Sequence, residues 1–345
     1  MVTLANAFAN RGHEVTMVLI YPRHTYKNEL DPKVELVDLN APRLAVGGLR
    51  FARFLRARCP DAVLSTLTRI NGWAVIAHRL ARSPARLVIR EANTPTQEMA
   101  RKRTRKNQLN QQVIKYLYPK ADAVVAPSRG VAQDILRFAP NLSGRIQVIY
   151  NPVINEHLYR LCQEPVEHPW FSSKAVPVVL AVGRLVEQKG FDTLIQAFSR
   201  IQKVTEAHLV ILGEGEKRAS LEEMITHLGL SNSVCMLGFQ PNPFKYMHRA
   251  DVFVLSSRHE GLPNVLIQAM ACGCPIVSTD CPSGPDEILN GGKFGELVPV
   301  DDVEAMAGAI LRVLQGNRKS VPEEWLQQFE VERITDQYLR LLLES

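Results

Sequence analysis

The sequence has no apolar run that approaches the roughly 18 residues of a membrane span. It also has no secretory leader at its start, and it has neither internal repeats nor low-complexity segments, so we expect a cytoplasmic globular protein. The six cysteines form no CxxC pair and have no histidines at zinc-finger spacing. A metal site at Cys272, Cys274 and Cys281 is the less favoured interpretation, because buried thiols in a reducing compartment account for them.

Charge is distributed unevenly along the 345 residues. Residues 1–165 contain 25 lysines and arginines against 12 acidic residues, whereas residues 166–345 contain 16 against 23. A chain of this length usually forms two domains, and the two halves would then have different partners. The basic half suits phosphates, nucleic acid or an anionic membrane surface, and charge alone does not choose among them.

Short apolar strands alternate with helices along the chain, which is typical of parallel sheets covered by helices. In the first half we expect strands at 14–20, 34–39, 62–65, 87–90, 123–127 and 146–150, and helices at 1–11, 49–58, 73–81, 97–118 and 129–138. In the second half we expect strands at 178–182, 208–212, 234–237, 252–256 and 276–279, and late helices at 303–314 and 331–343. Prolines and the lack of a regular period predict a linker at 151–176.

The stretch 255–286 predicts a ligand site. A buried strand is followed by a polar loop that contains Glu260, and Pro263 suits the first turn of the next helix. Ligands of open α/β sheets bind at the carboxyl ends of strands, where helix N-termini attract anions. Glu260 and Gln268 could bind sugar hydroxyls there. Alternatively, Glu260 complements the helix dipole and Gln268 is an ordinary exposed helix residue.

A second candidate segment, GRLVEQKG at 183–190, follows the strand at 178–182. Gly183 allows close approach of a ligand, and Arg184 and Lys189 suit a diphosphate. Both cations could equally be solvated loop charges. The glycines at Gly213 and before Phe239 end the next two strands and are weak signals alone.

These motifs together resemble family-4 glycosyltransferases, retaining enzymes of GT-B architecture. The resemblance rests on GRLVEQKG, LGEGEKRASLE, LGF and DVFVLSSRHEGLPNVLIQAMACGCPIVSTD, in that order. Weaker similarity through LANAFANRGHEV and VIYNPV covers the first half. The resemblance implies two Rossmann-like domains with parallel sheets facing across a cleft, with boundaries at 1–155, 156–328 and a returning C-terminal helix at 329–345.

The resemblance also implies a role for each matching residue. Arg184 and Lys189 would bind the donor diphosphate, Glu260 the transferred sugar, and Gln268 the ribose. Backbone groups of the donor site are expected at Gly183, Gly213, Phe239, Gly261, Leu262 and Asn264. No metal ligands and no cofactor are expected, since the basic pair neutralises the diphosphate and no DxD-like motif stands near it.

Three departures from the family pattern bear on activity. Gln268 stands where the family has its second acid. The first strand and Gly-rich loop of the first domain have no counterpart, because Met1 aligns inside the following helix. The segment after the fourth strand lacks the histidine of many relatives, and Glu91 or Asn93 would take that role; the alternative for Glu91 is a helix cap or a solvated loop residue.

The basic run Arg101–Lys106 is either a solvated helix face or a contact with an anionic membrane or a lipid-diphosphate acceptor. Nucleic acid is not expected, because the run has no interleaved aromatics.

We therefore expect a retaining transferase that moves a hexose or N-acetylhexosamine from a UDP-sugar to a lipid-linked or polysaccharide acceptor, including lipopolysaccharide, at the cytoplasmic membrane face. The alternatives are a donor-binding remnant that acts as a partner subunit, and a GT-B UDP-sugar epimerase.

Overall fold

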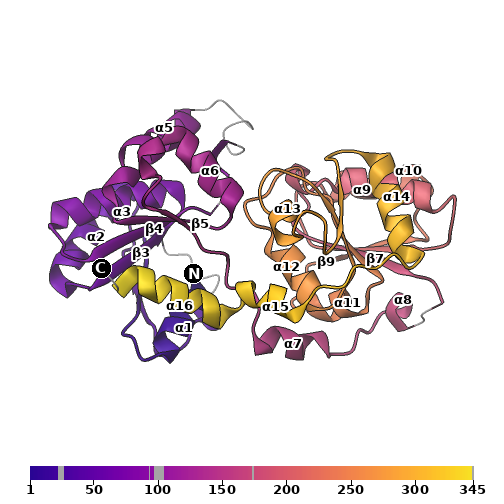
Figure 1. Cartoon of the computed structure of the whole chain (residues 1–345), viewed down its shortest axis with the longest axis horizontal. Coiled ribbons are helices and arrows are strands. Elements are labelled where there is room, and N and C mark those ends of the chain that lie inside the picture. The colour runs from indigo at the N-terminus through magenta and orange to yellow at the C-terminus, as the bar shows by residue number, and fades with distance from the viewer. Residues whose placement is uncertain (22–26, 93, 97–104, 173–174, 344–345) are drawn as a thin grey trace. The chain divides into compact units, whose positions relative to one another are not determined.

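The computed structural model describes residues 1–21, 27–92, 94–96, 105–172 and 175–343 (Figure 1). These residues divide into two compact units. Unit 1 is Met1–Pro152 together with Gln328–Ser345, and unit 2 is Val153–Gln327. Within the described ranges, no helix combines the length and the apolar character that crossing a bilayer requires.

Unit 1 contains two parallel sheets. Strands β1 and β2 pair with each other, and β3, β4, β5 and β6 form a four-stranded sheet in that order. That the family's first strand and Gly-rich loop have no counterpart before the chain's first helix stays a prediction. The elements of unit 1 are α1 (Val2–Asn10), β1 (Thr16–Leu19), β2 (Glu35–Asp38), α2 (Leu44–Arg58), β3 (Ala62–Thr66), α3 (Thr68–Ala81), β4 (Arg86–Arg90), α5 (Arg105–Tyr116), β5 (Ala123–Ala126), α6 (Arg129–Phe138), β6 (Ile146–Val148) and α16 (Val331–Leu343).

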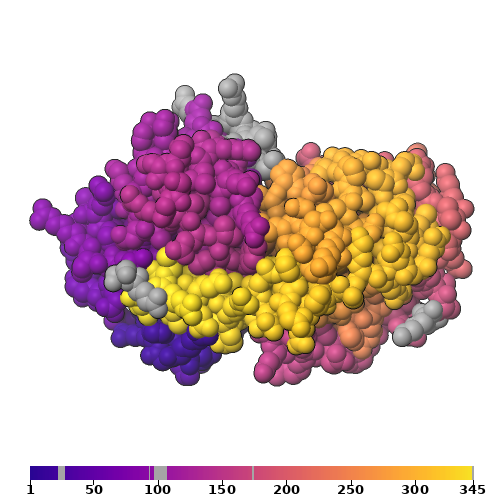
Figure 2. All heavy atoms as spheres, in the orientation of Figure 1, coloured from indigo at the N-terminus to yellow at the C-terminus, as the bar shows by residue number. Residues whose placement is uncertain are grey.

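Alternating residues of β5 bury two different faces of the four-stranded sheet. Val124 and Ala126 pack with α2, α3, α5 and α6, whereas Ala123 and Val125 pack with α1 and α16. Tyr338 of α16 is fully buried in the second cluster. Figure 2 shows this helix, in yellow, lying against the violet surface of unit 1. The sheet is thus covered on both faces, as a near-continuous apolar strand requires.

The six strands predicted in the first half are confirmed within two residues at each end. Ser128 caps α6 by accepting a hydrogen bond from the Val131 amide. The predicted starts of α2 and α3 were five residues too late. Gly47 and Gly48 are poor helix formers and conceal the start of α2, yet a Cβ on Gly48 would lie 2.3 Å from the Trp73 ring. Residues 97–104 of the helix predicted at 97–118 lie outside the described residues.

Unit 2 contains one parallel sheet in the order β12-β11-β10-β7-β8-β9. Phe198 of α9 and Ile310 of α14 are fully buried against it. The elements are α7 (Glu156–Cys162), α8 (Pro169–Ser172), β7 (Val178–Val182), η4 (Glu187–Lys189), α9 (Phe191–Ile201), β8 (His208–Leu212), α10 (Arg218–His227), β9 (Val234–Gly238), α11 (Phe244–Arg249), β10 (Val252–Leu255), α12 (Asn264–Ala271), β11 (Ile276–Thr279), α13 (Pro285–Ile288), β12 (Glu296–Val298), α14 (Val303–Leu314) and α15 (Glu323–Leu326).

The linker predicted at 151–176 was wrong in part, because seven of its residues form α7 and four form α8. Asn155 caps α7 by accepting a hydrogen bond from the Leu158 amide, and Leu158 and Cys162 are buried. Proline did not prevent these short helices, since Pro169 is the first residue of α8. The three-residue strand β12 was also missed.

Candidate active site

The candidate site lies where the strand order of unit 2 reverses. From β7 the chain continues to β8 and β9 on one side of the sheet and returns to β10, β11 and β12 on the other. The carboxyl ends of β7 and β10 therefore bound the crevice in which open α/β sheets bind ligands. The two loops that leave these ends are 183–190 and 256–263, and they belong to the two segments, 183–190 and 255–286, that the sequence singled out.

Lys189 and Glu260, predicted from separate motifs, form an ion pair across this crevice. The Lys189 Nζ lies 2.6 Å from the Glu260 Oε1, and their side chains are only 14% and 10% exposed. Ser257 Oγ donates a second hydrogen bond, 2.7 Å long, to the same carboxylate oxygen. The pair places one cation and one acceptor within reach of a single ligand.

Glycine permits the two loops to touch. Gly190 has φ +59°, and a Cβ there would lie 2.1 Å from the Ser256 carbonyl oxygen. Ser256 Oγ in turn donates to the Lys189 carbonyl at 2.7 Å. The backbone next to Lys189 is therefore fixed against the end of β10, which explains why glycine ends the GRLVEQKG segment.

Sequence reasoning missed Arg258, which fastens the two loops together. Its guanidinium donates to the Glu187 carbonyl at 2.6 Å and to the Asp192 carboxylate at 2.7 Å. It also pairs with Asp301 at 2.8 Å. Hydrogen bonding to Asp192 raises the pKa of Arg258 above its ordinary value. The residue two positions before Glu260 thus holds the loop that carries Lys189. No signal in the sequence indicated this role, because Asp192 and Asp301 lie 66 and 43 positions away from Arg258.

Arg184 lies in the same loop and is exposed. Within the described part of the chain no hydrogen bond or ion pair is recorded for its guanidinium. Arg184 is thus available to an anion at the end of β7, whereas the Lys189 ammonium is already paired with Glu260.

Helix α12 begins directly after the Glu260 loop. Among the described residues no side chain caps its N-terminus, and its first turn contains no acid. Gly261, Leu262 and Asn264, the predicted backbone donors, all lie at this end. Gln268 lies in the second turn, is half-buried, and makes no side-chain hydrogen bond within the described ranges. The positive end of the helix dipole accordingly borders the crevice.

The next two strands extend the site along the same sheet edge. Gly213 directly follows β8 and has φ +142°, and a Cβ there would lie 1.9 Å from the Gly183 carbonyl oxygen. Phe239 follows β9, and it is 75% exposed. An exposed ring at the end of a strand can stack on a planar base.

The cysteines of this region are buried. Burial raises the pKa of the Cys281 thiol to about 12, and the nearby Glu260 carboxylate acts in the same direction. The thiols of Cys162 and Cys272 lie 2.9 Å apart. Among residues that the structure describes, no three His, Cys, Asp or Glu side chains are grouped to hold a metal ion. Metal independence stays a prediction.

In unit 1, Glu91 directly follows β4 and is 2% exposed. Its carboxylate accepts hydrogen bonds from Tyr118 Oη at 2.5 Å, Thr68 Oγ1 at 3.0 Å and the Ala92 amide at 2.9 Å. Burial and the neighbouring Glu91 carboxylate raise the pKa of Tyr118 well above its ordinary value. These contacts favour the interpretation that Glu91 positions neighbouring groups and does not itself contact a substrate. Asn93 lies outside the described residues.

Two family models match the chain. Glycosyl transferases group 1 matches residues 167–326, and Glycosyltransferase Family 4 matches residues 1–157. The chain is 34% identical over 280 residues to N-acetylgalactosamine-N,N'-diacetylbacillosaminyl-diphospho-undecaprenol 4-alpha-N-acetylgalactosaminyltransferase of Campylobacter jejuni, covering 81% of this chain and 73% of the relative. It is 29% identical to the lipopolysaccharide core biosynthesis glycosyltransferase LpsE of Rhizobium meliloti, covering 99% and 94%.

Among solved structures, Anabaena Alr3699/HepE in complex with UDP superimposes with a TM-score of 0.81 at 22% identity, covering 99% of this chain and 94% of that one. This likeness establishes the fold, two Rossmann-like domains of the GT-B type. With the family matches, it confirms the predicted fold class. The chain belongs to the family-4 glycosyltransferases.

Proposed function

We propose that this protein transfers a sugar from a UDP-sugar to a lipid-linked or polysaccharide acceptor, with retention of anomeric configuration and no metal ion. An N-acetylhexosamine is the favoured sugar. The names of the Campylobacter and Rhizobium relatives, which act on a diphospho-undecaprenol acceptor and in lipopolysaccharide core synthesis, support the acceptor class. The UDP bound to the Anabaena neighbour supports the donor nucleotide.

The observation that carries this proposal is the Lys189–Glu260 pair at the crevice between β7 and β10. A donor diphosphate would compete with Glu260 for the Lys189 ammonium, and Arg184 would supply a second cation. The released Glu260 oxygen would then accept hydrogen bonds from hydroxyls of the transferred sugar.

The donor would extend along the carboxyl edge of the sheet. Its diphosphate would lie at the N-terminus of α12, its ribose near Gln268, and its base beside Gly213 and Phe239. An amide such as Gln268 both donates to and accepts from a ribose diol, so the lost charge does not remove the contact.

In the reaction, the bond between the anomeric carbon and the diphosphate oxygen breaks while the acceptor oxygen bonds to the same face of that carbon. The acceptor proton passes to the departing phosphate. Arg184, Lys189 and the α12 amides stabilise the negative charge that develops on the diphosphate, which removes the need for a covalent nucleophile.

Calorimetric titration with UDP and UDP-N-acetylhexosamines, paired with an assay of acceptor-independent hydrolysis, tests this function. We expect UDP to bind and the UDP-sugar to be hydrolysed slowly. Failure of UDP to bind would refute the donor site. Binding without turnover would support a donor-binding partner subunit, and inversion at a ring carbon without hydrolysis would support an epimerase.

Once an acceptor is found, the anomeric configuration of its product tests retention by NMR.

A further inference from the structure

The outer surface of α2 and α3 in unit 1 is unusual in its charge. Residues 43–90 contain ten arginines and a single acidic residue, Asp61. Eight of the ten are exposed: Arg43, Arg50, Arg53, Arg56, Arg58, Arg69, Arg79 and Arg82. Of these eight, only Arg58 has a carboxylate partner, Glu35, within the described ranges. Such a surface lacks the counter-charges that a solvated helix face usually carries.

Helix ends explain part of this composition. Arg56 and Arg58 stand in the last turn of α2, and Arg79 stands in the last turn of α3, where a cation complements the helix dipole. Arg53 lies inside α2 and Arg69 near the start of α3, where the dipole gives no such benefit. The arginines therefore need a second explanation.

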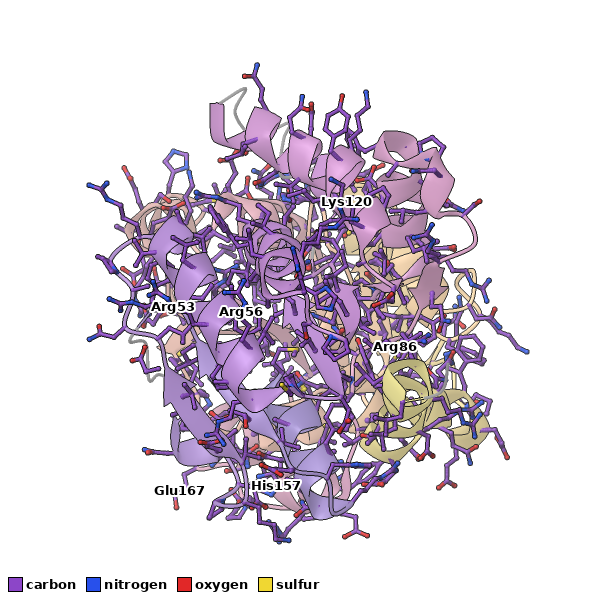
Figure 3. All side chains as sticks on the ribbon, turned by 90° about the vertical axis from the view of Figure 1, so that its left-hand side faces the viewer. Arg53, Arg56, Arg86, Lys120, His157 and Glu167 are labelled. Atoms are coloured by element: carbon purple, nitrogen blue, oxygen red, sulfur yellow. The ribbon has the colours of Figure 1, made fainter. Side chains whose placement is uncertain are left out.

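Two contacts join α2 and α3 into one continuous surface. Gly48 of α2 lies directly against the Trp73 ring of α3. Arg56 donates a hydrogen bond to the Leu80 carbonyl near the other end of the pair. Figure 3 looks onto this side of unit 1 and labels Arg53 and Arg56 on α2.

Apolar side chains lie among these arginines. Leu49 is 52% exposed and Leu80 is 47% exposed, and the half-buried Trp73 packs against Gly48, the residue before Leu49. On α2, the spacing of Leu49, Arg53 and Arg56 places them on one stripe. We call the surface made by these residues the α2–α3 face; its members are Leu49, Arg53, Arg56, Trp73, Arg79 and Leu80.

We propose that the α2–α3 face docks onto the surface of an anionic phospholipid bilayer. Guanidinium groups bind lipid phosphates bidentately, and leucine and tryptophan side chains enter the boundary between headgroups and acyl chains. The exposed leucines favour a bilayer over nucleic acid, whose backbone offers no apolar layer. This surface is separate from the donor site of unit 2, so the inference does not depend on the proposed reaction. It also differs from the run at Arg101–Lys106, of which 101–104 lie outside the described residues.

Co-sedimentation with vesicles of phosphatidylcholine and phosphatidylglycerol in equal parts, at low ionic strength and without nucleotide, tests this inference. The double variant Arg53→Gln/Arg79→Gln removes two guanidinium groups that form no ion pair or side-chain hydrogen bond with other described residues. We expect the partition coefficient to fall about thirtyfold. The matched control Lys203→Gln/Lys217→Gln removes the same charge from unit 2 and should partition like the unaltered protein.

A second variant, Leu49→Ser/Leu80→Ser, leaves the charge unchanged and should also weaken vesicle binding. Thermal unfolding of each variant checks the fold, and calorimetry with UDP should show unaltered donor binding, which separates this inference from the proposed function. Absence of binding by the unaltered protein would overturn the inference, and so would equal loss in the arginine variant and its control. Binding to duplex DNA in place of vesicles would assign the surface to nucleic acid.

Discussion

The Lys189 ammonium lies 2.6 Å from the Glu260 carboxylate, although 71 positions separate the two residues in the sequence. Each belongs to a loop that leaves the carboxyl end of a neighbouring strand, so strand order alone brings them together. In the absence of ligand, the ammonium and the carboxylate neutralise each other's charge. On the proposed function, a donor would exchange this pair for contacts of its own, and we expect the residues that hold the two loops to determine how well the exchange succeeds.

Arg258 is expected to position both loops. Replacing it with glutamine leaves Asp192 and Asp301 without their shared cation, and since the group is 25% exposed we expect a loss of about 1–2 kcal/mol in the free energy of unfolding. Turnover should fall more than donor affinity, because the placement of Lys189 changes. Chemical unfolding and steady-state kinetics measure the two effects. The control Arg200→Gln removes a surface ion pair with Glu304, and it should alter neither.

Phe239 is expected to stack on the base of the nucleotide. Phe239→Ala should weaken the binding of UMP and of UDP alike, by about 1–3 kcal/mol, which is the usual contribution of a base-stacking ring. The ring is 75% exposed, so the fold should be unaffected. Calorimetry with both nucleotides tests this. Loss of UDP binding with unchanged UMP binding would place the ring against the second phosphate, and unchanged binding of both nucleotides would place it outside the site.

Gln268 is expected to bind the ribose through its amide. Gln268→Ala should raise the dissociation constant of UDP by about three- to tenfold, the usual net effect of one or two hydrogen bonds. Gln268→Glu keeps an acceptor, so it should bind UDP more tightly than the alanine variant does. Comparison with 2'-deoxy-UDP tests the contact directly, since removal of one hydroxyl of the diol should narrow the difference in affinity between the glutamine and alanine proteins.

Glu296 is expected to make the stability of unit 2 depend on acid. Hydrogen bonds from Lys319 and Arg312 lower the pKa of this carboxylate. Because its pKa is lowered, the ionised Glu296 carboxylate stabilises the fold at pH values above about 4.3, the ordinary pKa of a glutamate. This contribution is lost as the pH falls through the lowered pKa of the folded protein. The melting temperature of Glu296→Gln should therefore lie below that of the unaltered protein at neutral pH, and the difference should shrink in acid. A difference that is constant with pH would argue against the linkage.

The sequence predicted most of the fold because buried parallel strands are short apolar runs between helices. The strands 178–182, 208–212 and 276–279 were located to the residue. Prediction from the sequence failed where the local helix propensity was low but tertiary packing still formed a helix. Glycines concealed the start of α2, and prolines concealed α7 and α8. In both cases packing outweighs local propensity.

The sequence predicted which loops form the candidate site, but it did not predict the contacts that hold these loops. Arg184, Lys189, Glu260 and Gln268 follow from motifs at strand ends. Arg258 does not, because its role depends on Asp192 and Asp301, which the strand order brings to it from other parts of the chain. Burial of Glu91 among Tyr118 and Thr68 was likewise invisible, since a lone glutamate after a strand resembles an exposed loop residue.

The central claim is that Lys189 and Arg184 stabilise the diphosphate as the donor bond breaks. Donor turnover of Lys189→Ala and Arg184→Ala, measured beside the exposed control Lys203→Ala of the same unit, tests it most directly. We expect each site variant to lose about a hundredfold or more in kcat, the usual effect of removing one charge-stabilising group. The control should retain full turnover. Unchanged kcat in both site variants would contradict the account.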